Sequence, residues 1–332
     1  MAALKTRLAP AAARVERLFD RLGRRRPRKA GTIDAYIGYS EPEALVARGR
    51  VLASDRDRDP QEGQRWYRNL AQMISLFLTD EVADVEVRAE GMSTRTDEEG
   101  YFTLRLPRPE GAQGWVTVTV DAPVAAELPV LVSNPAADYG VISDIDDTMM
   151  KTGAYSIWRN LWTSMTGNAL TRHVFPDAVD LMERLQDGVN PVFYVSSSPW
   201  NLHGFLEEVF ARNELLRGPK FLRDLGISET QFVTGTHGDH KGAAIDRIMG
   251  ANPGLGFVLV GDTGQHDAEV YLAAAERHEG RVRRVILRAP GRGADAKDMD
   301  FVRKIEALGI PVHVDADYRK VIAVLEDQRA VA

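Results

Sequence analysis

Residues 139–148 read Tyr-Gly-Val-Ile-Ser-Asp-Ile-Asp-Asp-Thr, and this stretch decides the fold of the second half of the chain. Its apolar run predicts a buried strand, after which come the carboxylates of Asp144, Asp146 and Asp147. Like charges this close repel one another, and partial burial strengthens the repulsion. An acidic surface loop is the plainer interpretation, but the apolar run holds the carboxylates against a sheet. A divalent cation would relieve the repulsion, so the stretch predicts a metal site at a strand end.

Outward from this stretch, apolar runs alternate with helical patterns as far as residue 327. This alternation predicts an α/β domain with a parallel sheet that helices cover on both faces. In such a sheet, functional side chains collect at the carboxyl ends of the strands. The expected strands lie at 140–145, 191–196, 256–261, 282–287 and 310–314, and the expected helices near 177–187, 199–212, 241–250, 266–278, 298–308 and 317–327.

Residues 31–135 show short alternating patterns that are typical of β structure. Together with Gly and Asp turns, they predict a small sandwich. Residues 96–102 resemble the hairpin of transthyretin-like or immunoglobulin-like accessory domains. Residues 64–78 carry a helical pattern and are predicted to be an insertion. The expected strands are Val46–Leu52, Val82–Arg88, Tyr101–Leu106 and Trp115–Val120.

Residues 1–30 combine helical apolar spacing with a dense set of arginines. A solvated tail, or a helix packed on its own protein, is the plainer interpretation of such a charge pattern. The alternative is an amphipathic helix that lies on an anionic membrane surface, where each Lys or Arg gains roughly 1 kcal/mol. We therefore expect a cytoplasmic protein, with peripheral membrane contact through residues 1–30 as the hypothesis to test.

Composition narrows the classes of function. The 332 residues are 44% hydrophobic and carry a net charge of -6, so no overall positive field attracts nucleic acid, and no nucleic-acid partner is expected. The absence of cysteine excludes disulfides, thiolate metal sites and cysteine nucleophiles. The sequence contains no run of about 18 apolar residues, so no membrane-spanning helix is predicted. The oligomeric state is not indicated.

Further polar motifs follow other predicted strands. Asp262 and Asp267 come directly after the run at 256–261, and Asp144 and Asp262 would face each other across one metal if their strands are neighbours. Oxygen ligands without cysteine favour Mg²⁺ over zinc. Ser196, Ser197 and Ser198 follow the run at 191–196, where hydroxyl and backbone N–H groups can bind a phosphate oxygen. Ser198 could instead cap the next helix.

Lys241 lies near the start of a predicted helix, where the helix dipole disfavours a cation. A surface lysine is the plainer interpretation. An anionic ligand nearby would explain its position between two strand-end motifs.

Four pieces resemble the motif set of the haloacid dehalogenase superfamily of phosphatases. In chain order they are Asp144, Asp146 and Thr148, then Ser196, then Lys241, and then Asp262 and Asp267. A closer likeness is to the actin-patch-associated, magnesium-dependent phosphatidate phosphatase family, bacterial members of which have a β domain ahead of the catalytic part. The likeness covers roughly residues 139–290. It rests on Asp144-Ile145-Asp146-Asp147-Thr148, Tyr194-Val195-Ser196-Ser197-Ser198-Pro199-Trp200, Gly218-Pro219-Lys220-Phe221-Leu222-Arg223-Asp224, His240-Lys241 and Gly261-Asp262-Thr263-Gly264-Gln265-His266-Asp267 with Tyr271.

The resemblance implies a haloacid dehalogenase-like Rossmannoid sheet with a small cap or none, preceded by a small β-sandwich domain. It divides the chain into a basic segment at 1–30, the β domain at 31–135 and a catalytic domain at 136–332. It also implies a Mg²⁺-dependent phosphomonoester hydrolase that converts phosphatidate to diacylglycerol and phosphate through an aspartyl-phosphate.

The same resemblance assigns roles to single residues. Asp144 is the expected nucleophile, Asp146 the general acid and base, and Ser196 and Lys241 bind phosphoryl oxygens. The expected metal ligands are the carboxylates of Asp144 and Asp262 and the main-chain carbonyl of Asp146, with Asp267 supporting the metal through water or by holding Lys241. Thr148, Ser197 and Ser198 are the expected substrate-binding residues, and Thr148 is also expected to fix the loop. Asp147 is interpreted as no more than a solvated or capping residue.

Two alternatives stay open. One is a phosphatase that acts on a non-lipid phosphoester or a phosphoprotein, and the other is a non-catalytic scaffold that binds anionic lipid. Residues 149–176 bear on the choice, because their aromatic side chains predict either a helix packed on the core or a lid that faces lipid.

Overall fold

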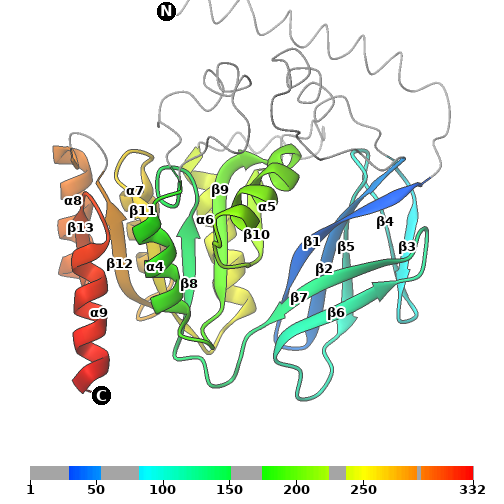
Figure 1. Cartoon of the computed structure of the whole chain (residues 1–332), viewed down its shortest axis with the longest axis horizontal. Helices are drawn as coiled ribbons and strands as arrows, with labels where there is room; N and C mark the ends of the chain where they lie inside the picture. Colours follow the sequence, from blue (N-terminus) through cyan, green and yellow to red (C-terminus); the bar gives the residue numbers. More distant parts are fainter. Residues whose placement is uncertain (1–29, 54–81, 151–173, 224–236, 290–292, 332) are drawn as a thin grey trace, which may run out of the picture.

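The computed structural model describes residues 30–53, 82–150, 174–223, 237–289 and 293–331. Side chains are described throughout these ranges except at 237–239 and 329–331. These residues form two main sheets (Figure 1). The larger sheet has the strand order β10-β9-β8-β11-β12-β13, and each neighbouring pair is parallel. The α/β prediction with a parallel sheet is therefore confirmed.

Helices alternate with the strands of this sheet along the chain, as the sequence patterns predict. Two clusters of buried apolar side chains cover its two faces, one around Phe257 and the other around Tyr194. The strands are β8 (Tyr139–Asp144), β9 (Val192–Pro199), β10 (Lys220–Arg223), β11 (Gly256–Asp262), β12 (Val282–Arg288) and β13 (Val312–Asp315). The helices are α4 (Pro176–Gln186), the 3₁₀ turn η2 (Trp200–Leu202), α5 (His203–Arg212), α6 (His237–Ala251), α7 (Asp267–Arg277), α8 (Ala296–Ala307) and α9 (Arg319–Val331).

The order of the strands decides which loops meet. β8 lies between β9 and β11, with Asp144 opposite Val195 and Ser143 opposite Val260. The ends of these three strands therefore share one edge of the sheet. This edge brings together the segments that begin at Asp144, Ser196 and Asp262.

The residues before 133 build a second, five-stranded sheet with the order β5-β2-β1-β7-β6, accompanied by the hairpin β3-β4. A separate apolar cluster around Leu104 and Val118 packs between these strands. The strands are β1 (Thr32–Ser40), β2 (Ala44–Leu52), β3 (Glu86–Ala89), β4 (Met92–Arg95), β5 (Tyr101–Pro107), β6 (Gly114–Val120) and β7 (Ala126–Val132).

One predicted strand begins later than expected. β3 begins at Glu86 rather than at Val82. Asp84 has a φ of 55°, a left-handed conformation that interrupts an extended strand. The Thr96 hydroxyl stabilises this turn, because it donates to the Val82 carbonyl at 2.8 Å and accepts from the Val85 amide at 2.9 Å.

Four strands were not predicted. β1, β4 and β7 lie in the N-terminal part and β10 in the α/β part. β4 and β10 each contain only four residues, too few for an alternating pattern to emerge.

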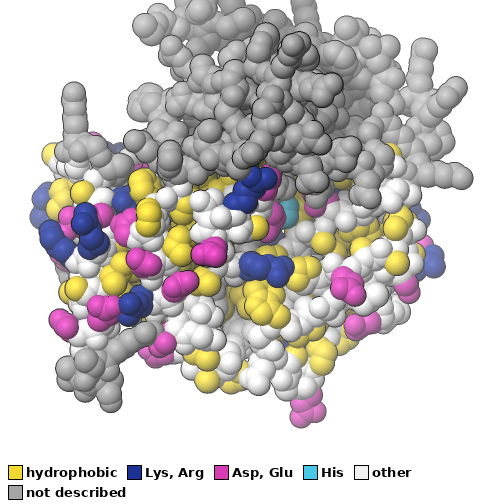
Figure 2. All heavy atoms as spheres, in the orientation of Figure 1, with side chains coloured by type: hydrophobic (Ala, Val, Ile, Leu, Met, Phe, Trp, Pro, Cys, Tyr) yellow, Lys and Arg dark blue, Asp and Glu magenta, His cyan; other side chains and the backbone are white. Residues whose placement is uncertain are grey.

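Several predictions concern residues that the structure does not describe. These are the amphipathic segment at 1–29, the helical insertion at 64–78 and the aromatic lid or packed helix at 151–173. Among the residues it does describe, no helix combines the length and the apolar character needed to cross a membrane. On the face shown in Figure 2, basic and acidic side chains of the described residues are interspersed rather than gathered into one patch.

Candidate active site at the strand ends

Three buried carboxylates meet at the carboxyl ends of β8 and β11. Asp144 is the last residue of β8, Asp262 is the last residue of β11, and Asp267 is the first residue of α7. Each offers one oxygen, and these oxygens lie within 4.8 Å of one another. All three side chains are almost completely buried, with at most 1% of each residue exposed.

Lys241 is the cation that faces these carboxylates. Its Nζ lies 2.7 Å from Asp144 Oδ1 and 2.5 Å from Asp267 Oδ1. Lys241 is the fifth residue of α6 and is buried, so the plainer interpretation of a surface lysine is wrong. Burial alone would lower the pKa of Lys241, but the charges of Asp144 and Asp267 outweigh it and raise that pKa.

Among the described residues, this one ammonium faces three carboxylates and does not balance their charge. Burial raises the pKa of Asp144 well above its usual value, Lys241 opposes this shift, and Asp267 and Asp146 add to it. Burial, followed by the charges of Asp267 and Asp144, raises the pKa of Asp262 to about 9. Without further positive charge, Asp262 therefore favours its protonated form at neutral pH.

The donor set fits a hard divalent cation. Among the described residues, Asp144 Oδ2 and Asp262 Oδ2 are buried and have no hydrogen-bond partner. Buried carboxylate oxygens without a donor are costly, and a cation would satisfy both. Asp267 differs, because its Oδ1 contacts Lys241 and its Oδ2 accepts from the Asp262 amide at 3.1 Å. Asp267 thus holds Lys241 and the Asp262 backbone in place, which is one of the two roles expected for it.

The Asp146 carboxylate points to Ser196–Trp200, which are the last four residues of β9 and the first residue of η2 and are called the serine loop below. Its Oδ2 accepts from Ser196 Oγ at 2.8 Å and from Ser198 Oγ at 3.1 Å. Ser196 Oγ also accepts from the Ser198 amide at 2.9 Å, which closes the loop around the carboxylate. Burial raises the pKa of Asp146 although the Ser196 hydrogen bond lowers it. In this structure both hydroxyls serve Asp146, while Ser197 is half-buried beside them.

A tight turn carries Asp146 and Asp147 away from β8. Asp147 has a φ of 56°, and its amide donates to the Met150 carbonyl at 2.9 Å. Asp147 is buried, so the interpretation as a solvated residue is wrong. Thr148 is fully buried in the same turn, and its carbonyl accepts from the Tyr318 hydroxyl at 3.4 Å.

Gly261 keeps the Asp262 side of the site close-packed. A Cβ at this position would lie 2.5 Å from Asp267 Oδ2 and 2.7 Å from the Tyr271 hydroxyl oxygen. That hydroxyl donates to the Val260 carbonyl at 2.7 Å. Any larger residue at Gly261 would therefore displace Asp267, and with it Lys241.

Sequence reasoning assigned no role to two polar groups near this edge. Gln265 donates through Nε2 to the main-chain carbonyl of Asp146 at 2.9 Å, the same carbonyl that was expected to bind the metal. Its place in the motif after Asp262 was the available signal. Arg288, at the end of β12, pairs with Asp177 at 2.7 Å and lies over the rings of Phe175 and Tyr318. No local pattern marks Arg288, because its partners are distant in the sequence. Asp177 lies 111 residues away and Tyr318 lies 30 residues away.

Comparisons with known proteins find likeness over the part of the chain that contains this cluster. Residues 139–289 match the family model described as the catalytic domain of the phosphatidate phosphatase APP1. A curated relative, the phosphatidate phosphatase APP1 of Saccharomyces cerevisiae, is 28% identical over 181 residues, which are 52% of this chain. The chain spans only 30% of the length of that yeast protein.

Among solved structures, the chain resembles one described as the structure of the Pnkp1/Rnl/Hen1 RNA repair complex. The likeness has a TM-score of 0.31 and 11% sequence identity, and it covers 64% of this chain and 50% of that one.

Proposed function

We propose that this chain is a Mg²⁺-dependent phosphatase that hydrolyses phosphomonoesters through an aspartyl-phosphate on Asp144, with phosphatidate as its substrate. The observation that carries the proposal is the buried cluster of Asp144, Asp262 and Asp267 around Lys241, with two carboxylate oxygens left without a donor. The match of residues 139–289 to a phosphatidate phosphatase catalytic domain supports the same reaction and substrate.

Asp144 is suited to act as the nucleophile. Lys241 holds its Oδ1, while its Oδ2 has no hydrogen-bond partner among the described residues. In the first step, an Asp144 oxygen attacks phosphorus and the bond between phosphorus and the alcohol oxygen breaks. The product is an aspartyl-phosphate and a free diacylglycerol.

Asp146 is suited to move the protons. Because burial raises its pKa, its carboxyl group can hold a proton and donate it to the leaving alcohol oxygen. In the second step, Asp146 takes a proton from the water that attacks phosphorus, the bond between the Asp144 oxygen and phosphorus breaks, and phosphate leaves. Ser196 and Ser198 hold the Asp146 carboxylate in position through both steps.

Asp144, Asp262 and the Asp146 carbonyl are the proposed ligands of Mg²⁺, and Asp267 supports them by holding Lys241. When bound, the ion would neutralise the surplus carboxylates and lessen the repulsion between Asp144 and the phosphate. Lys241 supplies positive charge to the phosphoryl oxygens from the same side. We assign substrate contacts to Thr148, Ser197 and Ser198 in line with the sequence motif.

The resemblance also underlies a proposal for the architecture. We assign residues 136–332 to a haloacid dehalogenase-like catalytic domain with a small cap or none, and residues 31–135 to a β-sandwich domain. Residues 1–30 are then a basic segment that contacts anionic membrane from the cytoplasm.

The decisive experiment measures phosphate release from short-chain phosphatidate in mixed micelles, with Mg²⁺ and with chelator. Wild type is compared with Asp144→Asn and with Asp300→Asn, whose carboxylate is exposed on α8. We expect release that requires Mg²⁺, is lost in Asp144→Asn and persists in Asp300→Asn.

Other outcomes separate the parts of the proposal. Release from an aryl phosphate that requires Asp144, without release from phosphatidate, would keep the phosphatase and reject the lipid substrate. Release from neither substrate would reject the phosphatase, and binding to anionic vesicles would then favour a scaffold.

A further inference from the structure

The N-terminal sheet packs against the α/β part close to the serine loop. β1 and β2 face η2, α5 and the edge strand β10 (Figure 1). Tyr39 and Val46, from β1 and β2, belong to the same buried apolar cluster as Phe221 of β10 and Val195 of β9. The two parts therefore share one core at this point.

Arg48 of β2 is a buried cation in this contact. Its guanidinium donates to the Ile37 carbonyl at 2.7 Å and to the Lys220 carbonyl at 3.2 Å. It also lies 5.5 Å from the centre of the Trp200 ring and 4.8 Å from that of Phe221. Lys220 opens the edge strand β10, so Arg48 satisfies a carbonyl at a sheet edge that would otherwise need another donor.

Tyr36 of β1 holds Trp200, the last residue of the serine loop. The two rings stack with centroids 4.7 Å apart and an interplanar angle of 17°. The centroid of the Tyr36 ring also lies 4.2 Å from that of His203, the first residue of α5. Such aromatic pairs contribute about 0.5–1.5 kcal/mol beyond their buried area.

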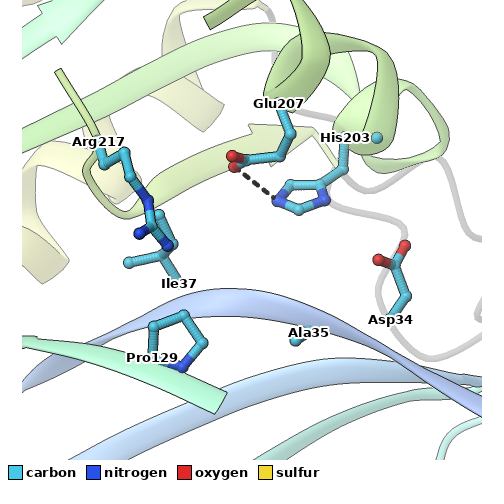
Figure 3. A pocket seen from close by; sticks show the side chains of 8 residues that line it. Asp34, Ala35, Ile37, Pro129, His203, Glu207 and Arg217 are labelled. Atoms are coloured by element: carbon cyan, nitrogen blue, oxygen red, sulfur yellow. Dashed lines mark ion pairs between the residues drawn. The ribbon is translucent and has the colours of Figure 1, made fainter. Parts of the chain in front are cut away.

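β1 contacts α5 through the rings of Tyr36 and His203. A cleft of about 300 Å³ separates the two elements beside His203, with Asp34, Ile37 and Pro129 on one wall and Glu207 on the other (Figure 3). Within this cleft His203 points to Glu207, and its Nε2 lies 3.2 Å from Glu207 Oε1. Beside the cleft, Tyr36 contacts the α/β part through the rings of Trp200 and His203.

Only Pro199 separates Trp200 from Ser198. The proline ring fixes φ at -71°, so a displacement of Trp200 passes to Ser198 with little room for absorption. Ser198 contributes both a hydroxyl to Asp146 and an amide to Ser196. The stacked tyrosine is thus connected to the Asp146 carboxylate through three consecutive residues.

We propose that Tyr36 and Arg48 of the N-terminal sheet are positioning residues for the serine loop, so that the β part is a working component of the active site. The inference rests on the proposed phosphatase for its kinetic readout. Tyr36 acts through Trp200, and Arg48 acts through Trp200 and β10. Neither contacts the substrate.

The test compares Tyr36→Ala with Tyr36→Phe, which keeps the stacked ring, in the full-length chain. A misplaced catalytic group lowers the rate of the chemical step even when the mutation is remote. On a soluble aryl phosphate with Mg²⁺, we expect Tyr36→Ala to lower kcat about tenfold with KM unchanged within about twofold. Tyr36→Phe should restore kcat to within about twofold of wild type, and Arg48→Met should behave like Tyr36→Ala.

The matched control is Trp115→Ala. Trp115 of β6 also contacts the α/β part, because Arg217 Cζ lies 5.3 Å from the centroid of its ring. In the contacts described, Trp115 touches no residue of the serine loop. It is half exposed, so its loss costs little packing. We expect wild-type kcat. A fall in kcat equal to that of Tyr36→Ala would overturn the proposal, because general docking of the two parts would then explain both.

A second readout does not depend on phosphatase activity. Hydrogen exchange of peptides spanning residues 192–202 should be faster in Tyr36→Ala than in wild type, Tyr36→Phe and Trp115→Ala, because the Ser198 amide loses its fixed partner. Unchanged exchange in a folded Tyr36→Ala would overturn the proposal even if wild type is active. If wild type releases no phosphate, the proposed function fails while the exchange experiment still decides the positioning role.

Discussion

At the ends of β8 and β11, three buried carboxylates face one ammonium group, whereas between α5 and β10 one carboxylate faces one ammonium and one imidazole. The first group consists of Asp144, Asp262 and Asp267 with Lys241 and is called the aspartate cluster. The second consists of Glu207, Lys220 and His203 and is called the α5–β10 cluster.

The two clusters differ in what burial does to their acids. In the aspartate cluster, burial and neighbouring carboxylates raise the pKa of Asp262 to about 9. In the α5–β10 cluster, burial would also raise the pKa of Glu207, but the hydrogen bond from His203 and the charge of Lys220 lower it to about 2. Glu207 stays ionised because described residues supply its positive partners, whereas the carboxylates of the aspartate cluster outnumber the described cations and favour a further cation.

The largest effect is expected for Lys241→Met, which removes the ammonium from the aspartate cluster. Phosphate release should fall about a thousandfold, because the phosphoryl oxygens lose their fixed cation. In chelator, the free energy of unfolding should fall by about 3 kcal/mol, since breaking a buried pair leaves uncompensated charge. Activity assays and urea unfolding measure the two effects.

Lys297→Met is the control for this change. Lys297 pairs with Glu269 at 3.2 Å on the exposed surface, so neither quantity should change much. Less than a tenfold loss of activity in Lys241→Met would contradict the assigned role of Lys241.

In metal-free protein, Asp262→Asn should raise the free energy of unfolding, which is the opposite of the effect expected for Lys241→Met. Between an unfolded pKa near 3.9 and a folded pKa of about 9, the folded wild type holds a proton that the unfolded chain has released. Its stability in chelator should therefore fall as pH rises, by up to about 4 kcal/mol from pH 5 to pH 8. The asparagine cannot titrate, so the variant should lose the part of this dependence that Asp262 contributes, while the part from Asp144 should remain.

The measurement is urea unfolding at a series of pH values, with chelator and with Mg²⁺. We expect Mg²⁺ to stabilise wild type most at high pH and to stabilise Asp262→Asn far less. Equal stabilisation of both proteins by Mg²⁺ would remove Asp262 from the metal site.

Glu207→Gln tests the α5–β10 cluster. The folded pKa of about 2 lies below the unfolded value, so the carboxylate contributes stability above about pH 4.5 that is lost as pH falls toward 2. Because a third of the side chain is exposed, we expect a loss of about 2 kcal/mol at pH 7 rather than the full effect of the shift. The loss should be the same with Mg²⁺ and with chelator. A loss that Mg²⁺ changes would mean that the two clusters are coupled.

The aspartate cluster could be predicted from the sequence because its residues follow strands. Asp144 and Asp262 come directly after apolar runs, and the rule that parallel strands end at one edge brings them together without any knowledge of side-chain contacts. The sequence could not show that Ser196 and Ser198 hold Asp146. That contact depends on the rotamers of three side chains, one from the turn after β8 and two from the end of β9.

The sequence contains no comparable pattern that would predict the α5–β10 cluster. Glu207 and Lys220 are 13 residues apart in different elements, and β10 was not predicted. The same holds for the contact of Arg48 with Trp200, since an arginine in a strand of alternating residues normally faces solvent. Pairing between parts of the chain that are 150 residues apart is a tertiary property, and local patterns do not specify it.

The smallest effect is expected for Glu208→Gln, one residue after Glu207 on α5. Glu208 pairs with Arg212 one turn along the helix, and both side chains remain partly exposed. Water and salt screen such a pair, so the free energy of unfolding should change by about 0.5 kcal/mol or less. Parallel urea titrations of the two variants at pH 7 measure the difference. If Glu208→Gln costs as much as Glu207→Gln, the charge of α5 as a whole, rather than burial beside Lys220, sets the stability of this cluster.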